Sequence, residues 1–567
     1  MQDSNEFIGY IVGGGLREGF RVRLTVPAFE VQEGSFVVCD SGRWRFFGLV
    51  TNLQLGATDP RFADEQSDRL APAVRSALLG RTLFTTLEVY ATLMMDRGPD
   101  DDGEFLAWQE QIEKGLEQSG PRPVKTVPAH HSKVRLADEG DVAEIFGKAG
   151  KGMLELGQTI EQGHPVRIDL NKLVKRSSGI FGATGTGKSF LTRMVLAGMM
   201  KEDVAGALVF DMHNEYAYDD LDSDNGINVM GLKSLFGSKV QVAGLGAGAR
   251  VRGNSPDFTL EIAYSDFTSA DMSLLAAVLK LTDVASVVMG ALFRAFGKNW
   301  LFEFMQLEPG LTIEDDKGKL IPAPGSVEEW ARAQNVNEIS ARTLHGRLKQ
   351  ITDRPYVVQK PAGDAVAAIV DQLENGRHVI LSFGEYDNDL DYLLVSNILT
   401  RRIREQWVKL TDDAKTNRTP NPKPIMIAIE EAHKLLSPQL ASQTAFGVIA
   451  RELRKYFVTL LVVDQRPSGI DDEIMSQLGT RITGWLGDED DIRAVLTGLA
   501  GRDQLRGMLA RLQEKQEVLL LGWGVKMPIP IKSRRYDQDF YDEMRGKRPT
   551  KQFDSIDDIN DLLGLGH

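Results

Sequence analysis

Short apolar runs separated by helical patterns organise the chain after about residue 150. Strand-like runs lie at 178–181, 206–210, 378–383, 425–429, 458–463, 481–486 and 517–521. Apolar residues recur with the helical period between many of these runs, which is typical of a largely parallel sheet covered by helices. A long section from 265 to 350 has helical periodicity, clearest at 274–279 and 341–351. The pattern predicts an α/β core over residues 151–545 with a helical insertion at about 265–350.

The first 120 residues follow a different pattern. Polar and apolar residues alternate over short, glycine-punctuated runs at 7–12, 21–26, 35–39 and 44–50, and residues 82–92 fit a further strand. Short strands at this spacing are typical of a small barrel. We therefore predict a β-barrel with a helical extension over residues 1–120 and, because residues 121–128 are rich in proline, a linker over 121–150. The polar, acidic end, residues 546–567, is predicted to be a loosely held tail.

Composition narrows the class of protein. The chain has 567 residues, of which 42% are hydrophobic and 26% charged, as in soluble globular proteins. Its one cysteine, Cys39, excludes a disulfide framework and fits a reducing cytoplasm. The N-terminus lacks a signal-peptide pattern, and no window of 18 apolar residues occurs, so we expect a cytoplasmic protein without a membrane span. The net charge of −14 argues against a general nucleic-acid coat but allows a ring with a basic lining.

A phosphate-binding loop lies between an apolar run and a helical pattern. Its residues are Gly182, Ala183, Thr184, Gly185, Thr186, Gly187, Lys188 and Ser189, which match GxxxxGK[ST] in the strand–loop–helix setting that this motif requires. The glycines let consecutive N–H groups point at triphosphate oxygens, together with the helix N-terminus. Lys188 can reach the β- and γ-phosphates, and the Ser189 hydroxyl suits Mg²⁺. The loop predicts binding of ATP with Mg²⁺.

A pair of carboxylates follows the apolar run 425–429. Glu430 is predicted to help hold the Mg²⁺ shell, and Glu431 to orient and polarise the attacking water. The run 458–463 ends near Gln465, whose amide could sense the γ-phosphate or, alternatively, only cap a loop. Polar residues also follow the second run, at 211–216. Because ligands bind at the carboxyl ends of strands in open α/β sheets, we expect these strand ends to converge on one site.

These motifs together resemble the HerA-type hexameric DNA translocases of the HerA/FtsK branch of P-loop ATPases. The resemblance covers nearly the whole chain and rests on segments 182–189, 211–216, 429–433, 451–455 and 464–468. It implies an N-terminal barrel like that of ATP-synthase subunits, a RecA-like core with a helical insertion, and a homo-hexameric ring with ATP between subunits and duplex DNA in its channel. Two departures from the family pattern are Glu430 in place of an Asp and Leu453 in place of a glycine.

The resemblance also assigns two arginines. Arg454 is similar to the arginine that enters the neighbouring subunit's site, and Arg176 is similar in placement to an arginine that acts in its own chain. Arg451, Arg466 and Arg481 are rivals for these roles, with a surface salt bridge as the alternative for each.

Two functions remain open from the sequence. The first is an ATP-driven motor on duplex DNA that works with a separate nuclease, in DNA end processing or antiphage defence. The second is an ATP-regulated ring scaffold that assembles and activates a partner, either a nuclease or a Sir2-like NAD-consuming enzyme. The chain shows no second catalytic constellation; its nearest metal-like pair, His130 and His131, falls in the predicted linker. Any nuclease or NADase activity is therefore expected to come from a partner.

Overall fold

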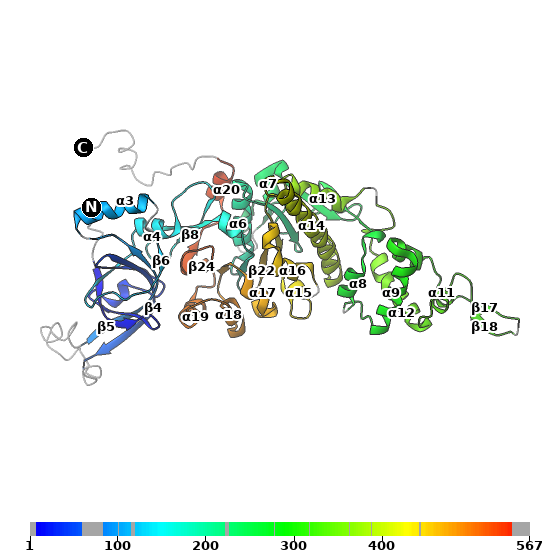
Figure 1. The fold of residues 1–567 in the computed structure, drawn as a ribbon, viewed down its shortest axis with the longest axis horizontal. Helices are drawn as coiled ribbons and strands as arrows, with labels where there is room; N and C mark the ends of the chain where they lie inside the picture. Colours follow the sequence, from blue (N-terminus) through cyan, green and yellow to red (C-terminus); the bar gives the residue numbers. More distant parts are fainter. Residues whose placement is uncertain are drawn as a thin grey trace.

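The computed structural model describes residues 7–58, 83–99, 101–114, 120–221, 226–276, 278–316, 318–361, 363–386, 388–441 and 444–546. Three parts follow one another along the long axis of the molecule: a barrel at one end, an α/β core in the middle and a helical section at the other end (Figure 1). All but the first residue of the predicted tail lies outside the described residues.

The barrel has six strands and is closed. They are β1 (Phe7–Gly15), β2 (Gly19–Leu24), β3 (Phe36–Ser41), β4 (Trp44–Ala57), β5 (Leu83–Asp96) and β7 (Lys133–Leu136). Their order is β2-β1-β7-β3-β4-β5, and pairing of β2 with β5 closes the ring. Short β6 (Arg122–Pro123) adds to β5, and helix α3 (Asp102–Glu113) precedes it. Closure leaves no free sheet edge among these six strands.

The segment predicted as a linker, 121–150, is structured instead. It contains β6, β7 and helix α4 (Glu139–Phe146), and β7 pairs with both β1 and β3. Strand β7 was not predicted because it follows the proline-rich residues 121–128, and its four residues are too few to stand out as an alternating pattern. The barrel therefore takes its sixth strand from the predicted linker.

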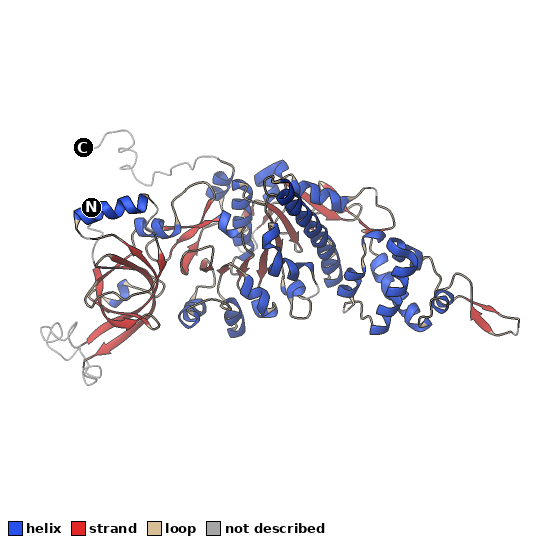
Figure 2. Ribbon diagram, in the orientation of Figure 1, coloured by secondary structure: helices blue, strands red, loops and turns tan. Residues whose placement is uncertain are grey.

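The core is a twelve-stranded sheet with helices on both faces (Figure 2), which confirms the predicted α/β class. Its order is β15-β14-β20-β11-β21-β22-β10-β23-β24-β25-β8-β9. The first eight strands run parallel: β15 (Phe258–Leu260), β14 (Val240–Leu245), β20 (His378–Ser382), β11 (Gly206–Asp211), β21 (Ile425–Ile429), β22 (Val458–Asp464), β10 (Ser178–Phe181) and β23 (Thr480–Thr483). The last four are antiparallel: β24 (Glu517–Gly522), β25 (Ile529–Ser533), β8 (Met153–Thr159) and β9 (Pro165–Asp169).

The seven apolar runs of the sequence all became central strands, because both faces of this sheet are buried. In β10, β11, β20, β21 and β22 every residue is buried. The covering helices include α6 (Lys188–Glu202), α13 (Ala365–Glu374), α14 (Asp389–Asn417), α16 (Ala445–Glu452), α17 (Asp472–Gln477), α18 (Glu489–Val495), α19 (Arg502–Arg511) and α20 (Gln538–Met544). Short α5 (Leu170–Leu173), α7 (Leu232–Phe236) and α15 (His433–Leu436) complete the core.

The helical section expected at about 265–350 comprises five helices and a hairpin. The helices are α8 (Ser269–Leu275), α9 (Asp283–Phe296), α10 (Trp300–Met305), α11 (Val327–Ala333) and α12 (Glu338–Thr352), and the hairpin is β17 (Thr312–Glu314) with β18 (Leu320–Pro322). Trp300 and Phe304 are fully buried at its centre. At its base, β16 (Ile262–Ala263) pairs in parallel with β19 (Val357–Val358), so the chain leaves and re-enters the core side by side.

A buried histidine makes the stability of the core dependent on pH. Ala207 donates its backbone N–H to Nδ1 of His378 at 3.2 Å, and burial lowers the pKa of His378 from 6.5 to about 4. The unfolded chain therefore binds more protons than the folded one between these values, so stability is complete above pH 6.5 and falls as the pH drops towards 4. At pH 5 we expect a loss on the order of 2 kcal/mol from this group.

Denaturant midpoints at pH 7 and pH 5 measure this loss. In His378→Gln the difference between the two midpoints should shrink, because the titrating group is gone. The same substitution at exposed His130 should leave the difference as in the parent protein. An unchanged difference in His378→Gln would contradict the assignment.

Candidate nucleotide site

The phosphate loop lies where the sequence predicts it, between β10 and the first residue of α6. Gly182, Gly185 and Gly187 have φ values of 155°, 81° and 90°, in a region of backbone conformation that residues other than glycine rarely adopt. A Cβ on Gly182 would also approach the Thr186 hydroxyl to 2.6 Å. Because Lys188 and Ser189 begin the helix, the first N–H groups of α6 lack intrahelical partners and point towards the loop. The loop is thus shaped for an anion.

Lys188 lies inside the loop. Its Nζ donates to the carbonyl oxygen of Ala183 at 3.0 Å. Burial lowers the pKa of Lys188, and the nearby charges of Glu431 and Asp464 oppose that shift. The ammonium group therefore contacts the loop and lies near carboxylates at the carboxyl ends of β21 and β22.

A hydrogen-bonded chain joins the phosphate loop to the second predicted carboxylate. Gln465 Nε2 donates to Oε1 of Glu431 at 2.9 Å, and the Thr184 hydroxyl donates to Oε1 of Gln465 at 2.5 Å. Glu431 has a left-handed φ of 46°, so the backbone turns sharply at the end of β21. Three segments far apart in the sequence thus bring Thr184, Glu431 and Gln465 together, as predicted.

Glu430 occupies a different environment from its neighbour. Its side chain is buried, and the Tyr216 hydroxyl donates to Oε1 at 2.5 Å. Burial, together with the nearby charge of Asp211, raises the pKa of Glu430 well above its usual value. Burial likewise raises the pKa of Asp211 to about 6.

The residues present fit a Mg²⁺ site of the kind that P-loop proteins build. Glu430 Oε2 is buried and has no hydrogen-bond partner in the described part of the chain, so one hard oxygen ligand is available beside the loop. The described residues contain no group of three or more His, Cys, Asp or Glu side chains that could hold a metal alone. Mg²⁺ takes few protein ligands and completes its shell with phosphate oxygens and water. Ser189, in the first turn of α6, is the second predicted ligand.

A histidine–aspartate pair beside Glu431 was missed from the sequence. His433 donates its backbone N–H to Asp464 Oδ2 at 2.7 Å, and its Nδ1 lies 3.0 Å from the same oxygen. This hydrogen bond to Asp464 raises the pKa of His433. Nδ1 also lies 3.7 Å from Oε2 of Glu431. The sequence could have identified this pair, because both residues stand at or just after strand ends and next to residues already assigned to the site.

The two assigned arginines lie at the other edge of the sheet. Arg176 precedes β10 and Arg454 precedes β22; since these strands are parallel, both arginines lie opposite the edge that carries the phosphate loop. The Arg176 guanidinium lies 4.7 Å from the ring centroid of Trp523. Burial lowers the pKa of Arg176, and the nearby positive charge of Arg454 lowers it further. Strand β10 lies between Arg176 and the phosphate loop of the same chain, and the role of Arg176 within its own chain stays a prediction.

The rival arginines have partners within the chain or lie elsewhere. Arg481 is 1% exposed and donates to the carbonyl oxygens of Met475 and Val495, which excludes it from contact with a neighbour. Arg451 bonds the Ala441 carbonyl oxygen and pairs with Glu473 at 3.4 Å. Arg466 follows β22, at the edge that carries the phosphate loop.

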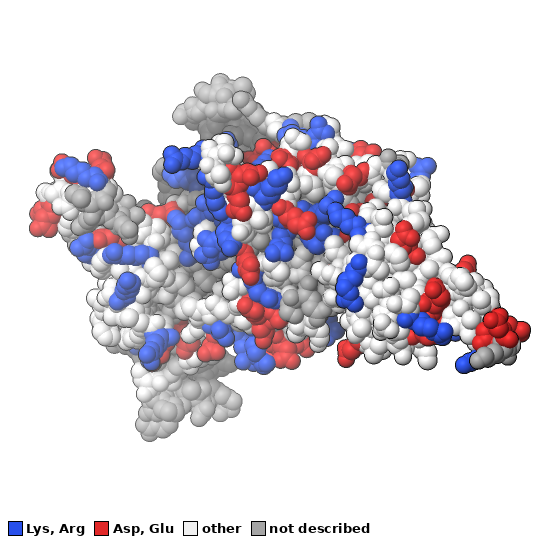
Figure 3. Space-filling view, turned by 45° about the vertical axis from the view of Figure 1, so that its right-hand side comes forward, with Lys and Arg blue, Asp and Glu red and all other residues white. Residues whose placement is uncertain are grey.

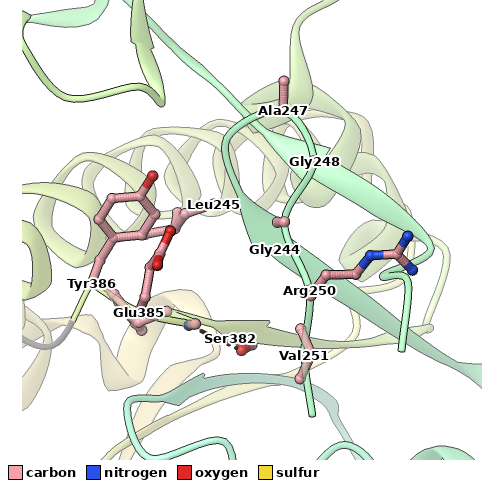
Figure 4. A pocket seen from close by; sticks show the side chains of 12 residues that line it. Gly244, Leu245, Ala247, Gly248, Arg250, Val251, Ser382, Glu385 and Tyr386 are labelled. Carbon is pink, nitrogen blue, oxygen red and sulfur yellow. Dashed lines mark hydrogen bonds between the residues drawn. The ribbon is translucent and has the colours of Figure 1, made fainter. Parts of the chain in front are cut away.

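A cavity near the carboxyl ends of the strands lies apart from the phosphate loop. It has a volume of about 280 Å³ and is lined by glycine-rich residues 244–251 after β14 and by 382–386 after β20 (Figure 4). Three strands (β11, β21 and β22) lie between β20 and β10 in the sheet. Glu385 is among its lining residues, whereas the Arg250 side chain points away from Glu385 (Figure 4), so the cavity is not an anion cradle.

Comparisons with a family model and with individual proteins both find similarity to HerA helicases. The family described as "Helicase HerA, central domain" matches residues 154–403. The DNA double-strand break repair helicase HerA of Sulfurisphaera tokodaii is 25% identical over 576 residues, which cover 99% of each chain. The protein of the same name from Sulfolobus acidocaldarius is 24% identical over 94% of this chain and 93% of that relative.

Solved structures are more distant. VirB4 of Thermoanaerobacter pseudethanolicus aligns with a TM-score of 0.41 and 16% identity, over 68% of this chain and 97% of VirB4. The plasmid coupling protein TrwB in complex with ADP and Mg²⁺ aligns with a TM-score of 0.42 and 13% identity, over 70% of this chain and 93% of TrwB. Within the described residues no helix is long and apolar enough to cross a membrane. The chain thus carries the phosphate loop and strand-end carboxylates of a P-loop ATPase, matches the HerA central domain over residues 154–403, and is similar to the HerA helicases along nearly its whole length.

Proposed function

We propose that the protein is an ATP-driven translocase on duplex DNA that works as a homo-hexameric ring. The observation that carries this proposal is the division of the catalytic groups between opposite edges of one sheet. The phosphate loop, Glu431 and Gln465 gather at the carboxyl edge, whereas Arg176 and Arg454 lie at the amino edge. A head-to-tail ring brings these two edges together at every interface, and such an interface closes only in a cyclic assembly.

The amino edge is suited to an anion from outside the chain. Arg176 and Arg454 are close enough to repel each other, and the buried Nε of Arg176 has no hydrogen-bond partner among the described residues. A polyphosphate of the neighbouring subunit would relieve that repulsion and stabilise the charge of the transition state. We therefore assign both arginines to the adjacent subunit's site, with Arg176 moved there from its expected role in its own chain.

At the carboxyl edge the chain's own residues bind and orient. Lys188 and the loop amides hold the phosphates, Ser189 and Glu430 would hold Mg²⁺, and that ion when bound neutralises phosphate charge. Glu431, fixed by Gln465, takes the proton of the attacking water as general base. Because Gln465 also bonds Thr184 of the loop, it can report phosphate occupancy to Glu431.

The DNA site is proposed to be the channel of the ring. On the face in Figure 3, Lys and Arg side chains are interspersed with Asp and Glu, and acidic residues gather near the hairpin at the end of the helical section. A mixed surface does not favour the DNA backbone, so a channel lining is the better place for contacts with phosphates. The relatives named DNA double-strand break repair helicases support this substrate.

A separate effector is the remaining part of the proposal. DNA cutting or NAD consumption is proposed to come from a partner, either a nuclease or a Sir2-like NAD-consuming enzyme, in end processing or antiphage defence. The assembled Glu431–Gln465–Thr184 chain supports ATP hydrolysis, which both a motor and an ATP-regulated scaffold would use.

Displacement of a third strand from duplex DNA tests the motor. The protein with ATP should release a triplex-forming strand from a long duplex, whereas Glu431→Gln should not, because it cannot complete the hydrolysis cycle. Binding of the duplex should be indifferent to sequence and should weaken roughly a thousandfold between 50 and 200 mM salt if about six phosphates are contacted. Duplex binding without displacement would favour the scaffold, and binding that is insensitive to salt would contradict the channel.

A further inference from the structure

Two buried tyrosines from different elements hold Glu430. The Tyr216 hydroxyl donates to the side-chain Oε1 at 2.5 Å, and the Tyr392 hydroxyl donates to the main-chain carbonyl oxygen at 2.7 Å. Both tyrosines are 0% exposed. The same residue is thus fixed at its backbone by α14 and at its carboxylate by the segment after β11.

The segment that carries Tyr216 is itself held firmly. The backbone N–H groups of Glu215 and Tyr216 donate to the two carboxylate oxygens of Asp211, at 2.7 and 3.0 Å. Arg193 of α6 donates to the carbonyl oxygen of Glu215 at 3.1 Å through Nε. The Tyr216 hydroxyl therefore stands at a defined point relative to both the sheet and the helix that begins with Lys188.

Fixing one carboxylate oxygen leaves the other with a single orientation. Glutamate has one more rotatable bond than aspartate, so its carboxylate needs an additional restraint to face a metal reproducibly. Tyr216 supplies that restraint at Oε1, and the buried Oε2 has no partner in the described part of the chain.

We infer that Tyr216 is a positioning residue for the metal: it holds Oε1 of Glu430 so that Oε2 is presented to the Mg²⁺ of the nucleotide complex. The inference rests on the assignment of Glu430 as a metal ligand under the proposed function. Partners of this kind orient ligands, and their removal commonly weakens metal binding by about 10- to 100-fold.

Tyr216→Phe tests the inference, with Tyr392→Phe as a matched control. Each change removes one buried hydroxyl that contacts Glu430, but only the first contacts the carboxylate. The probe is Mn²⁺ titrated into the full-length protein saturated with ADP and followed by electron paramagnetic resonance. We expect Mn²⁺ to bind about 10- to 100-fold more weakly in Tyr216→Phe and within a few-fold of the parent in Tyr392→Phe. Thermal unfolding should show similar losses of stability in both variants.

Equal Mn²⁺ affinity in Tyr216→Phe and the parent protein would overturn the inference, and so would equal weakening in both variants. Arg193→Lys provides an independent measurement if Tyr216→Phe does not fold. It removes the guanidinium that holds the Glu215 carbonyl oxygen, and so loosens the segment that carries Tyr216 without changing Glu430. Mn²⁺ binding should again weaken; undiminished affinity would show that the position of Tyr216 is not needed. Because Mn²⁺ binding needs neither DNA nor translocation, failure here leaves the proposed motor intact, and failure of strand displacement leaves this result intact.

Discussion

Glu431→Gln is expected to lower steady-state ATPase activity by about 10²- to 10⁴-fold, the range that a general base contributes, while ATP binding persists. Glutamine keeps the shape of the side chain and can still meet Gln465, which lies 2.9 Å from Glu431 Oε1. It cannot accept the proton of the attacking water. Binding of a fluorescent ATP analogue, measured beside phosphate release, separates the two effects.

The matched control is Glu104→Gln, the same chemical change at an exposed position of α3 in the barrel region. It should leave both binding and turnover near parental values. Turnover near the parental rate in Glu431→Gln would remove this residue from the catalytic role and direct attention to His433 and Asp464, the neighbouring pair.

Mixing two inactive variants should restore ATPase activity. Lys188→Ala lacks the main positively charged side chain that contacts the phosphates. Arg454→Ala lacks the arginine proposed to enter the neighbouring subunit's site. Each variant should therefore be inactive alone. In a randomly mixed ring, roughly a quarter of interfaces combine an intact Lys188 with a neighbour's intact Arg454. Subunit exchange is first verified with differently tagged chains, and ATPase activity is then measured across mixing ratios.

Arg176 can be tested in the same way, and the result distinguishes the two assignments made for it. If Arg176 acts on the neighbouring subunit, mixtures of Arg176→Ala and Lys188→Ala should also regain activity. If it acted within its own chain, every site would still lack one group. Activity that stays at the single-variant level despite verified exchange would withdraw the assignment in trans for the arginine tested, and Arg451 would be the next candidate for the Arg454 role.

The central strands and the phosphate loop could be predicted because local pattern determines them. Strands such as β21 and β22 are buried on both faces and read as unbroken apolar runs, and the loop needs glycines at fixed spacing. Strand β14 was missed because its glycine-containing sequence, Val240–Leu245, lacks the β-branched density of its neighbours. Strand β7 was missed because it owes its place to pairing with β1 and β3, which are far away in the sequence.

Only some of the side-chain contacts across the sheet could be predicted from the sequence. The meeting of Glu431 with Gln465 followed from the rule that parallel strands end at one edge. To place Arg176 at the amino ends of the strands, its position before β10 must be combined with the direction of that strand. The resemblance alone did not supply the strand direction. The hydrogen bond from Tyr392 of α14 to Glu430, which follows β21, joins residues that no periodic pattern links.

The pairing of strands β16 and β19 limits where homologues of this chain can gain or lose residues. Because residues 262–263 and 357–358 are hydrogen-bonded neighbours, everything between them is a side branch whose two ends meet at one point of the core. Residues can be gained or lost within that branch without shifting the register of β14, β20 or any strand that holds the nucleotide site. Homologues can therefore differ in the length and composition of this segment while the strands that position the nucleotide site keep their register.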